Sequence, residues 1–231
     1  MQEGPRAAVS LDPMASPALS VSTRPPAELE GDALIVGMAP APAGEEGVVL
    51  VGIEGGPLGE VAAGLRMLGL TGAVDETARV PAPAGVAAAS ILVVGLGRAP
   101  LTPEGLRTAA GTAARSLGTA ARVAIGLPTG TAAEVQAVLE GAAMGAYRFT
   151  GYRSAESTPG TVSIELATSV EGADEAALAA TATSGAVALV RDFVNTPPND
   201  LYPASFVDRA RAAANAVLAR FKAKAPTALP A

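Results

Sequence analysis

Cysteine and histidine are both absent from the 231-residue sequence. Without cysteine the chain has no disulfide and no thiolate metal site, which fits a reducing cytoplasm. Without histidine it has no Ser-His-Asp triad, no histidine-ligated zinc and no imidazole general base. These absences exclude most of the common hydrolytic sites and leave carboxylates as the metal ligands to look for.

Aromatic residues and positive charge are also scarce. Aromatics make up 3% of the chain and tryptophan is missing, so a core must be built from the aliphatic part of the 49% hydrophobic residues. The net charge of −6 argues against nucleic acid as the main ligand, because phosphate binding needs clustered Lys and Arg. The apolar runs are interrupted well before the roughly 18–20 residues of a membrane span, so we expect no membrane partner.

The order of apolar runs and turn signals predicts an α/β fold. Strands are expected where short apolar runs are bounded by Gly or Pro, and helices where apolar residues recur at helical spacing. Expected strands are 33–38, 48–53, 91–94, 122–125 and 162–166, the last at a half-exposed edge, with a less clearly marked one ending at Pro81. Expected helices are 57–69, 102–117, one opened by a Thr131–Glu134 capping box, 174–195, and one beginning at Pro203.

These elements predict four parts of the chain. Residues 1–30, rich in proline, are expected to form a disordered leader, and residues 31–170 an α/β domain with a mixed sheet. The long helix at 171–196 completes or leaves that domain, with Leu178, Ala182, Gly185, Leu189 and Phe193 expected on its packed side. Residues 197–231 are expected to form a linker helix and a frayed tail.

Gly95 and Gly97 follow a strand and precede a helix, which allows two interpretations. Backbone amides at a helix start attract anions, so these glycines are a candidate anion-binding turn. The dinucleotide-binding pattern, however, needs a third glycine where this chain has Pro100. A purely structural turn is the alternative, and the favoured one.

The acidic residues do not group into a catalytic or metal-binding set. Glu45 and Glu46, Asp75 and Glu76, and Asp174 and Glu175 are adjacent in sequence, and neighbouring residues do not face each other on a helix or strand. We therefore assign no catalytic residue and no metal ligand in this chain.

The stretch from Arg191 to Pro203 is the most distinctive. Two prolines must end the helix before them, and Pro203 suits the first turn of a new helix. This punctuation indicates either a tight loop or a junction between domains. The candidate junction residues are Asn195, Thr196, Pro197, Pro198 and Asn199.

That stretch resembles the segment that joins the two domains of leucyl (cytosol) aminopeptidases: Arg-Asp-aliphatic-Val-Asn-Thr-Pro-Pro, then Asn and a Leu-x-Pro step. Preceding motifs resemble the same family in order. They are the strand and turn at 91–97, Leu106-Arg107 with the alanine-rich helix to Arg115, Glu140-Gly141, Gly145, Tyr147–Phe149 and Tyr152–Ser154. The resemblance covers roughly residues 30–210.

The resemblance implies an amino-terminal, macro-domain-like α/β domain with an assembly or regulatory role. In that family the following domain binds two divalent metals, Zn, Mn or Mg, through Asp, Glu and Lys, and releases amino-terminal residues from peptides. The family forms hexamers in the cytoplasm. None of the catalytic motifs stands in this chain, so we expect its partners to be an aminopeptidase catalytic domain or further copies of itself, and the chain alone to be inactive.

Two other functions remain open. One is a free-standing macro-like module that binds a nucleotide or ADP-ribose, with Gly95 and Gly97 as contacts. The other is a non-enzymatic assembly partner of an intact aminopeptidase.

Overall fold

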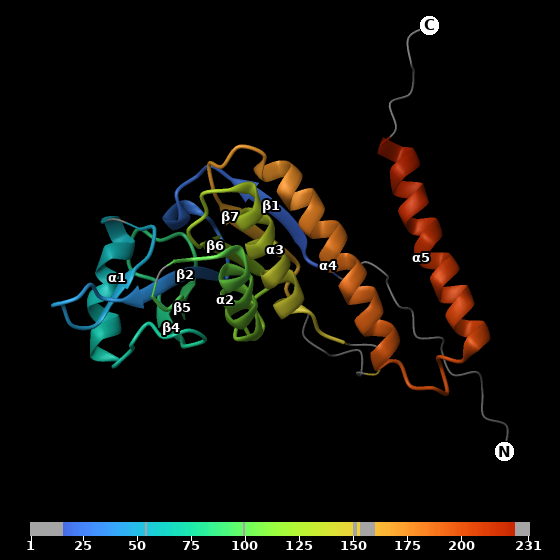
Figure 1. The fold of residues 1–231 in the computed structure, drawn as a ribbon, viewed down its shortest axis with the longest axis horizontal. Coiled ribbons are helices and arrows are strands. Elements are labelled where there is room, and N and C mark those ends of the chain that lie inside the picture. The colour runs from blue at the N-terminus through green and yellow to red at the C-terminus, as the bar shows by residue number, and fades with distance from the viewer. Residues whose placement is uncertain (1–15, 54, 99, 150–151, 153–159, 225–231) are drawn as a thin grey trace, which may run out of the picture.

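The structure is a computed structural model that describes residues 16–224 except 54, 99, 150–151 and 153–159. A seven-stranded mixed sheet forms its centre, with strand order β1-β7-β6-β2-β5-β4 and β3 paired to β2 (Figure 1). Neighbours from β1 to β5 run parallel, whereas β4 and β3 run antiparallel to β5 and β2. The strands are β1 (Ala18–Ser22), β2 (Ala33–Pro40), β3 (Val48–Leu50), β4 (Thr77–Pro81), β5 (Ser90–Gly95), β6 (Arg122–Gly126) and β7 (Ser163–Ala167). The expected α/β class with a mixed sheet is confirmed.

Helices cover both faces of this sheet. Leu58, Val61 and Leu65 of α1 pack on one face, and the helices α2, α3 and α4 cover the other. The central strands β2 and β5 are therefore buried on both sides, which explains their unbroken apolar sequences. The helices are α1 (Gly56–Met67), α2 (Pro103–Arg115), α3 (Ala132–Ala146), α4 (Ala173–Asn195) and α5 (Pro203–Lys224).

The helix starts follow the signals in the sequence. The Thr102 side chain accepts a hydrogen bond from the Gly105 amide and caps α2. Thr131 and Glu134 form the expected capping box at the start of α3. Because each cap satisfies amides that have no partner inside the helix, it fixes where the helix begins.

Helices α2 and α3 approach so closely that their contact requires glycine. A Cβ on Gly141 of α3 would lie 2.1 Å from the Arg107 carbonyl oxygen of α2, and one on Gly145 would lie 2.3 Å from the Gly111 carbonyl oxygen. Neither position has room for a side chain, because the obstacle is backbone. The glycines of the two helices thus set the distance between them.

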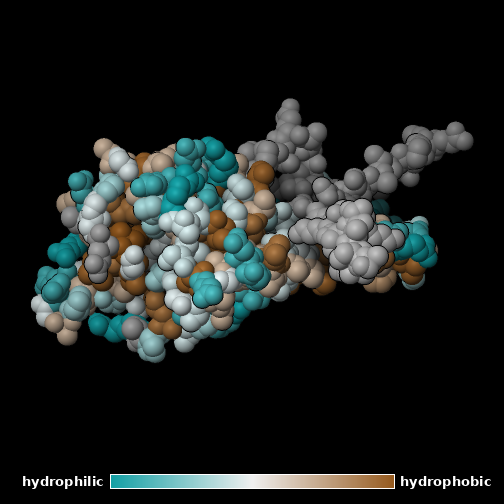
Figure 2. Space-filling view, turned by 90° about the horizontal axis from the view of Figure 1, so that it is seen from above, coloured by the Kyte–Doolittle hydropathy of each residue, from teal (hydrophilic) through white to brown (hydrophobic). Residues whose placement is uncertain are grey.

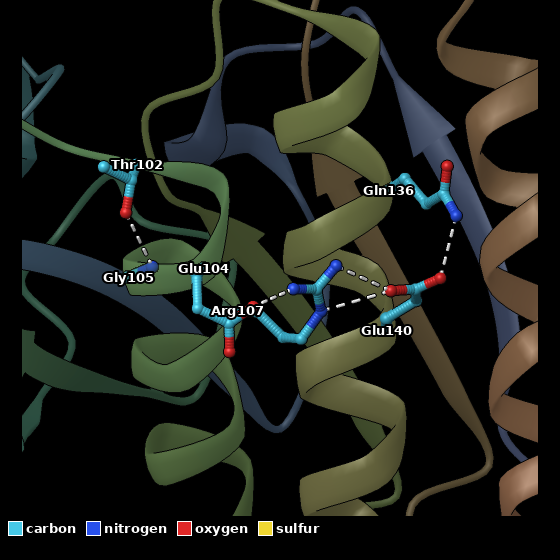
Figure 3. A network of polar contacts seen from close by, with 6 residues as sticks. All are labelled: Thr102, Glu104, Gly105, Arg107, Gln136 and Glu140. Atoms are coloured by element: carbon cyan, nitrogen blue, oxygen red, sulfur yellow. Dashed lines mark hydrogen bonds and ion pairs between the residues drawn. The ribbon is translucent and has the colours of Figure 1, made fainter.

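A buried ion pair crosses the same interface (Figure 3). Arg107 of α2 donates from Nε and Nη2 to Glu140 Oε2 of α3, at 3.2 and 3.0 Å, and also pairs with Glu104. Gln136 donates to the other Glu140 oxygen at 2.8 Å. The Glu140 side chain is only 5% exposed, so the pair and the glutamine together satisfy a carboxylate that water barely reaches.

The amino-terminal boundary of the domain differs from expectation. Ala18–Ser22, assigned to a disordered leader, forms strand β1 and pairs in parallel with β7. Strand β7 is consequently internal and not an edge strand, as had been expected from its alternating pattern. The pattern arises because Ile164 and Leu166 face the helices while the alternate residues are only half-buried. Residues 1–15 of the expected leader lie outside the described residues.

The packed side of α4 also differs from expectation. Its buried residues are Ala173, Ala176, Ala177, Ala180 and Ser184, and these line the contact with α3 and β1. Leu178, expected to be packed, is 59% exposed. Small residues face inward here because α4 lies close to its neighbours, and the larger aliphatic residues are left at the surface.

Among the described residues, α4 has the length and apolar composition of a membrane-crossing helix. This differs from the expectation that no apolar run is long enough. Alanine accounts for much of the apolar character, and the alanine-rich face packs against α3 and β1.

The α2–α3 contact gives a stability prediction. Gly141→Ala should lower the free energy of unfolding by about 1–3 kcal/mol, because the added methyl group forces two backbones apart. Chemical denaturation monitored by circular dichroism measures this.

The matched control is Gly185→Ala in α4, where an added Cβ meets nothing within 4 Å. This variant should be stabilised by about 0.5–1 kcal/mol, because alanine is the better helix former. Equal effects of the two substitutions would contradict the close contact.

Candidate functional site at the end of helix α4

Two segments that lie far apart in the sequence meet at the end of α4. Tyr147 follows α3, and its hydroxyl donates to Asp192 Oδ1 at 2.8 Å. Asn195 donates from Nδ2 to the same hydroxyl at 3.2 Å. Arg191 donates to the Met144 carbonyl oxygen at 2.7 Å, and its guanidinium lies 5.3 Å from the centre of the Tyr147 ring. The end of α4 is therefore bonded to the end of α3 by side chains from both helices.

Thr196 closes the helix. Its hydroxyl and its amide both bond to the Asp192 carbonyl oxygen, at 2.6 and 3.0 Å. Its backbone is extended, as the residue before a proline must be. The side chain is buried, so this threonine ends α4 and satisfies a carbonyl that has no partner within the helix.

The turn that follows is bonded in the same way. The Pro197 carbonyl oxygen accepts from the Asp200 and Leu201 amides at 3.0 and 2.9 Å. The Tyr152 hydroxyl donates to Asp200 at 2.6 Å. Pro198 and Asn199 are exposed on this turn. The structure thus places all five candidate junction residues in one compact connection between α4 and α5.

Burial changes the acidity of this cluster. Partial burial raises the pKa of Asp192, and the hydrogen bond from Tyr147 lowers it by a smaller amount. The pKa of Tyr147 is also raised, first by burial, with the Asn195 hydrogen bond opposing this and Asp192 adding to it. The phenol therefore donates a hydrogen bond to the carboxylate at a site where both side chains are half-buried.

The Gly95–Gly97 turn does not offer its amides to a ligand. The amides of Gly95, Leu96 and Gly97 donate to the carbonyl oxygens of Glu76, Met38 and Gly72, at 2.8, 2.8 and 3.0 Å. Gly97 has a φ of 69°, which favours glycine, and a Cβ on Gly95 would lie 1.7 Å from the Ala73 carbonyl oxygen. These contacts explain both glycines as parts of a structural turn.

A cleft of about 360 Å³ lies at the carboxyl ends of β1, β6 and β7, away from the two glycines. Three of its polar side chains already have partners. Arg24 lies 3.5 Å from Glu165, and the hydroxyls of Thr129 and Thr168 lie 3.0 Å apart. The cleft therefore adds no support for the nucleotide-binding alternative.

Comparison with known proteins agrees with the motifs. Residues 46–156 match the model of the cytosol aminopeptidase family, N-terminal domain. A probable cytosol aminopeptidase of Clavibacter michiganensis subsp. michiganensis is 41% identical over 203 residues, covering 84% of this chain and 39% of the relative. One of Streptomyces avermitilis is 38% identical over 218 residues, covering 85% and 42%. The chain carries the amino-terminal domain of the cytosol aminopeptidase family.

Solved structures support the same assignment. The bottromycin maturation enzyme BotP has a TM-score of 0.61 and 27% identity, covering 80% of this chain and 37% of BotP. A tomato leucine aminopeptidase has a TM-score of 0.67 at 18% identity, covering 84% and 41%, and shows the shared fold. The chain spans about 40% of the length of the curated relatives it matches. The expected relation to leucyl aminopeptidases is confirmed.

The sequence had not indicated the contacts of the two tyrosines. The segments at Tyr147 and Tyr152 and the segment from Arg191 both stood among the family-like motifs, but as separate stretches. One signal was available in the sequence. One segment holds two tyrosines and the other holds two aspartates, and a tyrosine hydroxyl readily donates a hydrogen bond to a carboxylate.

The raised pKa of Asp192 gives a pH prediction. A carboxyl whose pKa is higher in the folded state stabilises the protein below its unfolded value, and that contribution is lost as pH rises through the folded pKa. Asp192→Asn keeps an acceptor for Tyr147 but cannot ionise. The free energy of unfolding of this variant, relative to the unsubstituted protein, should therefore increase between pH 4 and pH 7 in urea denaturation.

Tyr147→Phe is the companion variant and should act in the opposite direction. Without the hydroxyl the carboxylate loses a hydrogen bond, so stability at pH 7 should fall by about 1 kcal/mol. A pH-independent difference for Asp192→Asn would show that this carboxyl does not change its ionisation on folding.

Proposed function

We propose that this domain docks and places the catalytic domain of a metal-dependent aminopeptidase, which removes amino-terminal residues from peptides. The observation that supports this most is the position of exposed apolar side chains. They lie on α4 and α5, on either side of the bonded connection that leaves the domain. Its relatives are more than twice as long as the segment that they share with this chain.

We call these side chains the α4–α5 apolar surface. They are Leu178, Val190 and Val194 of α4, and Phe206, Val207, Val217 and Leu218 of α5, and they are 46–79% exposed. On the face of the molecule drawn in Figure 2, hydrophobic residues are scattered among hydrophilic ones. Large apolar side chains exposed on neighbouring helices are candidates for an interaction surface, and their burial in a partner would stabilise the docked state.

The chemistry belongs to the partner domain. Among residues 16–224 as described, no group of three or more acidic side chains is placed to hold a metal ion. The residues present therefore do not fit the pair of Zn, Mn or Mg ions implied by the family resemblance. One of the similar structures is BotP in complex with Mn, with 29% identity and coverage of 35% of that enzyme.

Assembly and location follow from the same assignment. The relatives are named cytosol aminopeptidases, which supports a cytoplasmic location for the protein that contains this domain. Self-association, up to the hexamer of the family, is the assembly that we propose for it.

The assignment predicts no activity for the chain alone. Purified protein should release no leucine from leucinamide in the presence of Mn²⁺ or Zn²⁺, because no group of three or more acidic side chains among the described residues is placed to hold a metal ion. Mass spectrometry of the products measures this. Metal-dependent turnover that persists after removal of contaminating peptidases would overturn the assignment of the chemistry.

A chimera tests the docking role. Residues 18–224 of this chain, fused to the amino terminus of the catalytic part of the Clavibacter relative, should give an active peptidase. Val194→Asp in that chimera should lower thermal stability and activity, because burying an unpaired carboxylate at an interface is costly. Thr183→Asp, at an exposed polar position of α4, is the control and should change little. Equal activity of both variants would argue against the apolar surface.

A further inference from the structure

Helix α5 is tied to the domain at its first turns. The Phe206 ring packs edge-on against Phe193 of α4, with ring centres 5.2 Å apart. Arg209 Nη1 lies 3.4 Å from the hydroxyl of Thr196, the residue that ends α4. Both contacts join the near ends of the two helices, and α5 then extends outside the layers of the domain (Figure 1).

A second contact, made by Tyr152, restrains the turn between α4 and α5. Tyr152, from the segment after α3, donates its hydroxyl to Asp200 at 2.6 Å, and its ring lies 5.8 Å from that of Phe149. The Asp200 carbonyl oxygen in turn accepts from Ser205 Oγ of α5 at 2.9 Å. An aromatic contact therefore links Phe149, beyond α3, to Tyr152, and hydrogen bonds run from Tyr152 through Asp200 to the first turn of α5.

The Tyr152–Asp200 and Arg209–Thr196 contacts together restrict the direction of α5 more than either contact alone. Pro197 and Pro198 already fix their own φ angles, but rotation about the remaining bonds of the turn would still swing a long helix. The Tyr152–Asp200 bond joins the turn to a tyrosine whose ring contacts Phe149, and the Arg209–Thr196 bond joins the first turns of α5 to the end of α4.

We infer that Tyr152 and Arg209 are positioning residues that hold α5 in one direction relative to the domain. In the context of the proposed function, they present the apolar side chains of α5 to the catalytic domain already oriented. A preoriented helix loses less conformational freedom on docking, so the two side chains favour association without contacting the partner. The orientation itself is a property of this chain and does not depend on that function.

The absence of cysteine makes a direct measurement simple. Ala182→Cys on α4 and Ala214→Cys on α5 are exposed positions for a pair of spin labels, and the chain has no other thiol. Pulsed electron paramagnetic resonance then gives the distribution of distances between the two helices. With the native ties we expect one narrow distribution.

The test variant combines Tyr152→Phe with Arg209→Gln. It should broaden the distance distribution about twofold, because the turn is then free to fluctuate locally. Hydrogen exchange of Ile91–Val94 in the core should not change, which shows that the domain remains folded.

Arg211→Gln is the matched control. Arg211 is also a cation on α5, but it pairs with Asp208 of the same helix at 3.4 Å. It should leave the distribution narrow. An unchanged width in the double variant, or a broad distribution before substitution, would overturn the inference. Because the measurement uses this chain alone, either result leaves the docking proposal standing, and failure of the chimera would leave the orientation intact.

Discussion

The contact between α2 and α3 is the constraint on which the rest of the structure depends. Gly111, Gly141 and Gly145 let the two backbones meet, and the Arg107–Glu140 pair crosses the same interface. Removing one partner of a buried pair leaves an uncompensated charge, so the pair favours a single register of the two helices. That register fixes where α3 ends, and the end of α3 is where the contacts to the domain junction begin.

The connection between α4 and α5 is positioned through contacts with the end of α3. Tyr147, one residue beyond α3, bonds to Asp192 and Asn195, so α4 is fixed at its far end as well as along its alanine face. A polar network at this place specifies geometry in a way that alanine contacts do not, since small apolar side chains tolerate sliding. The connection between α4 and α5 is thus bonded, through the end of α4, to the end of α3.

Much of this architecture could be predicted from the sequence where the signal is local. The Thr131–Glu134 capping box, the apolar central strands and the helix end ahead of the double proline were all predicted correctly because each depends on neighbouring residues. Strand β1 was missed because its pairing with β7 joins residues 145 positions apart, as Ala18 with Ser163. The side assigned to α4 was right only in part: Leu178 and Ala182 are exposed and Gly185, Leu189 and Phe193 are half-buried, because close packing placed the smaller alanines on the fully buried face. Tyr147 and Tyr152 bond to aspartates that lie 45 and 48 positions further along the chain, so these contacts likewise depend on the tertiary fold.

Helix α5 links folding to docking. It spans 22 residues, and the bonds described here hold only its first turns. An isolated helix of this length is only marginally stable in water, and most helical stability in proteins comes from packing an apolar face. The far part of α5 still exposes Val217 and Leu218. Docking would therefore add stability to the helix as well as affinity to the interface, and the two effects are thermodynamically coupled. In the proposed complex, the contacts at its first turns would hold α5 to α4, and the catalytic domain would cover its remaining apolar side chains.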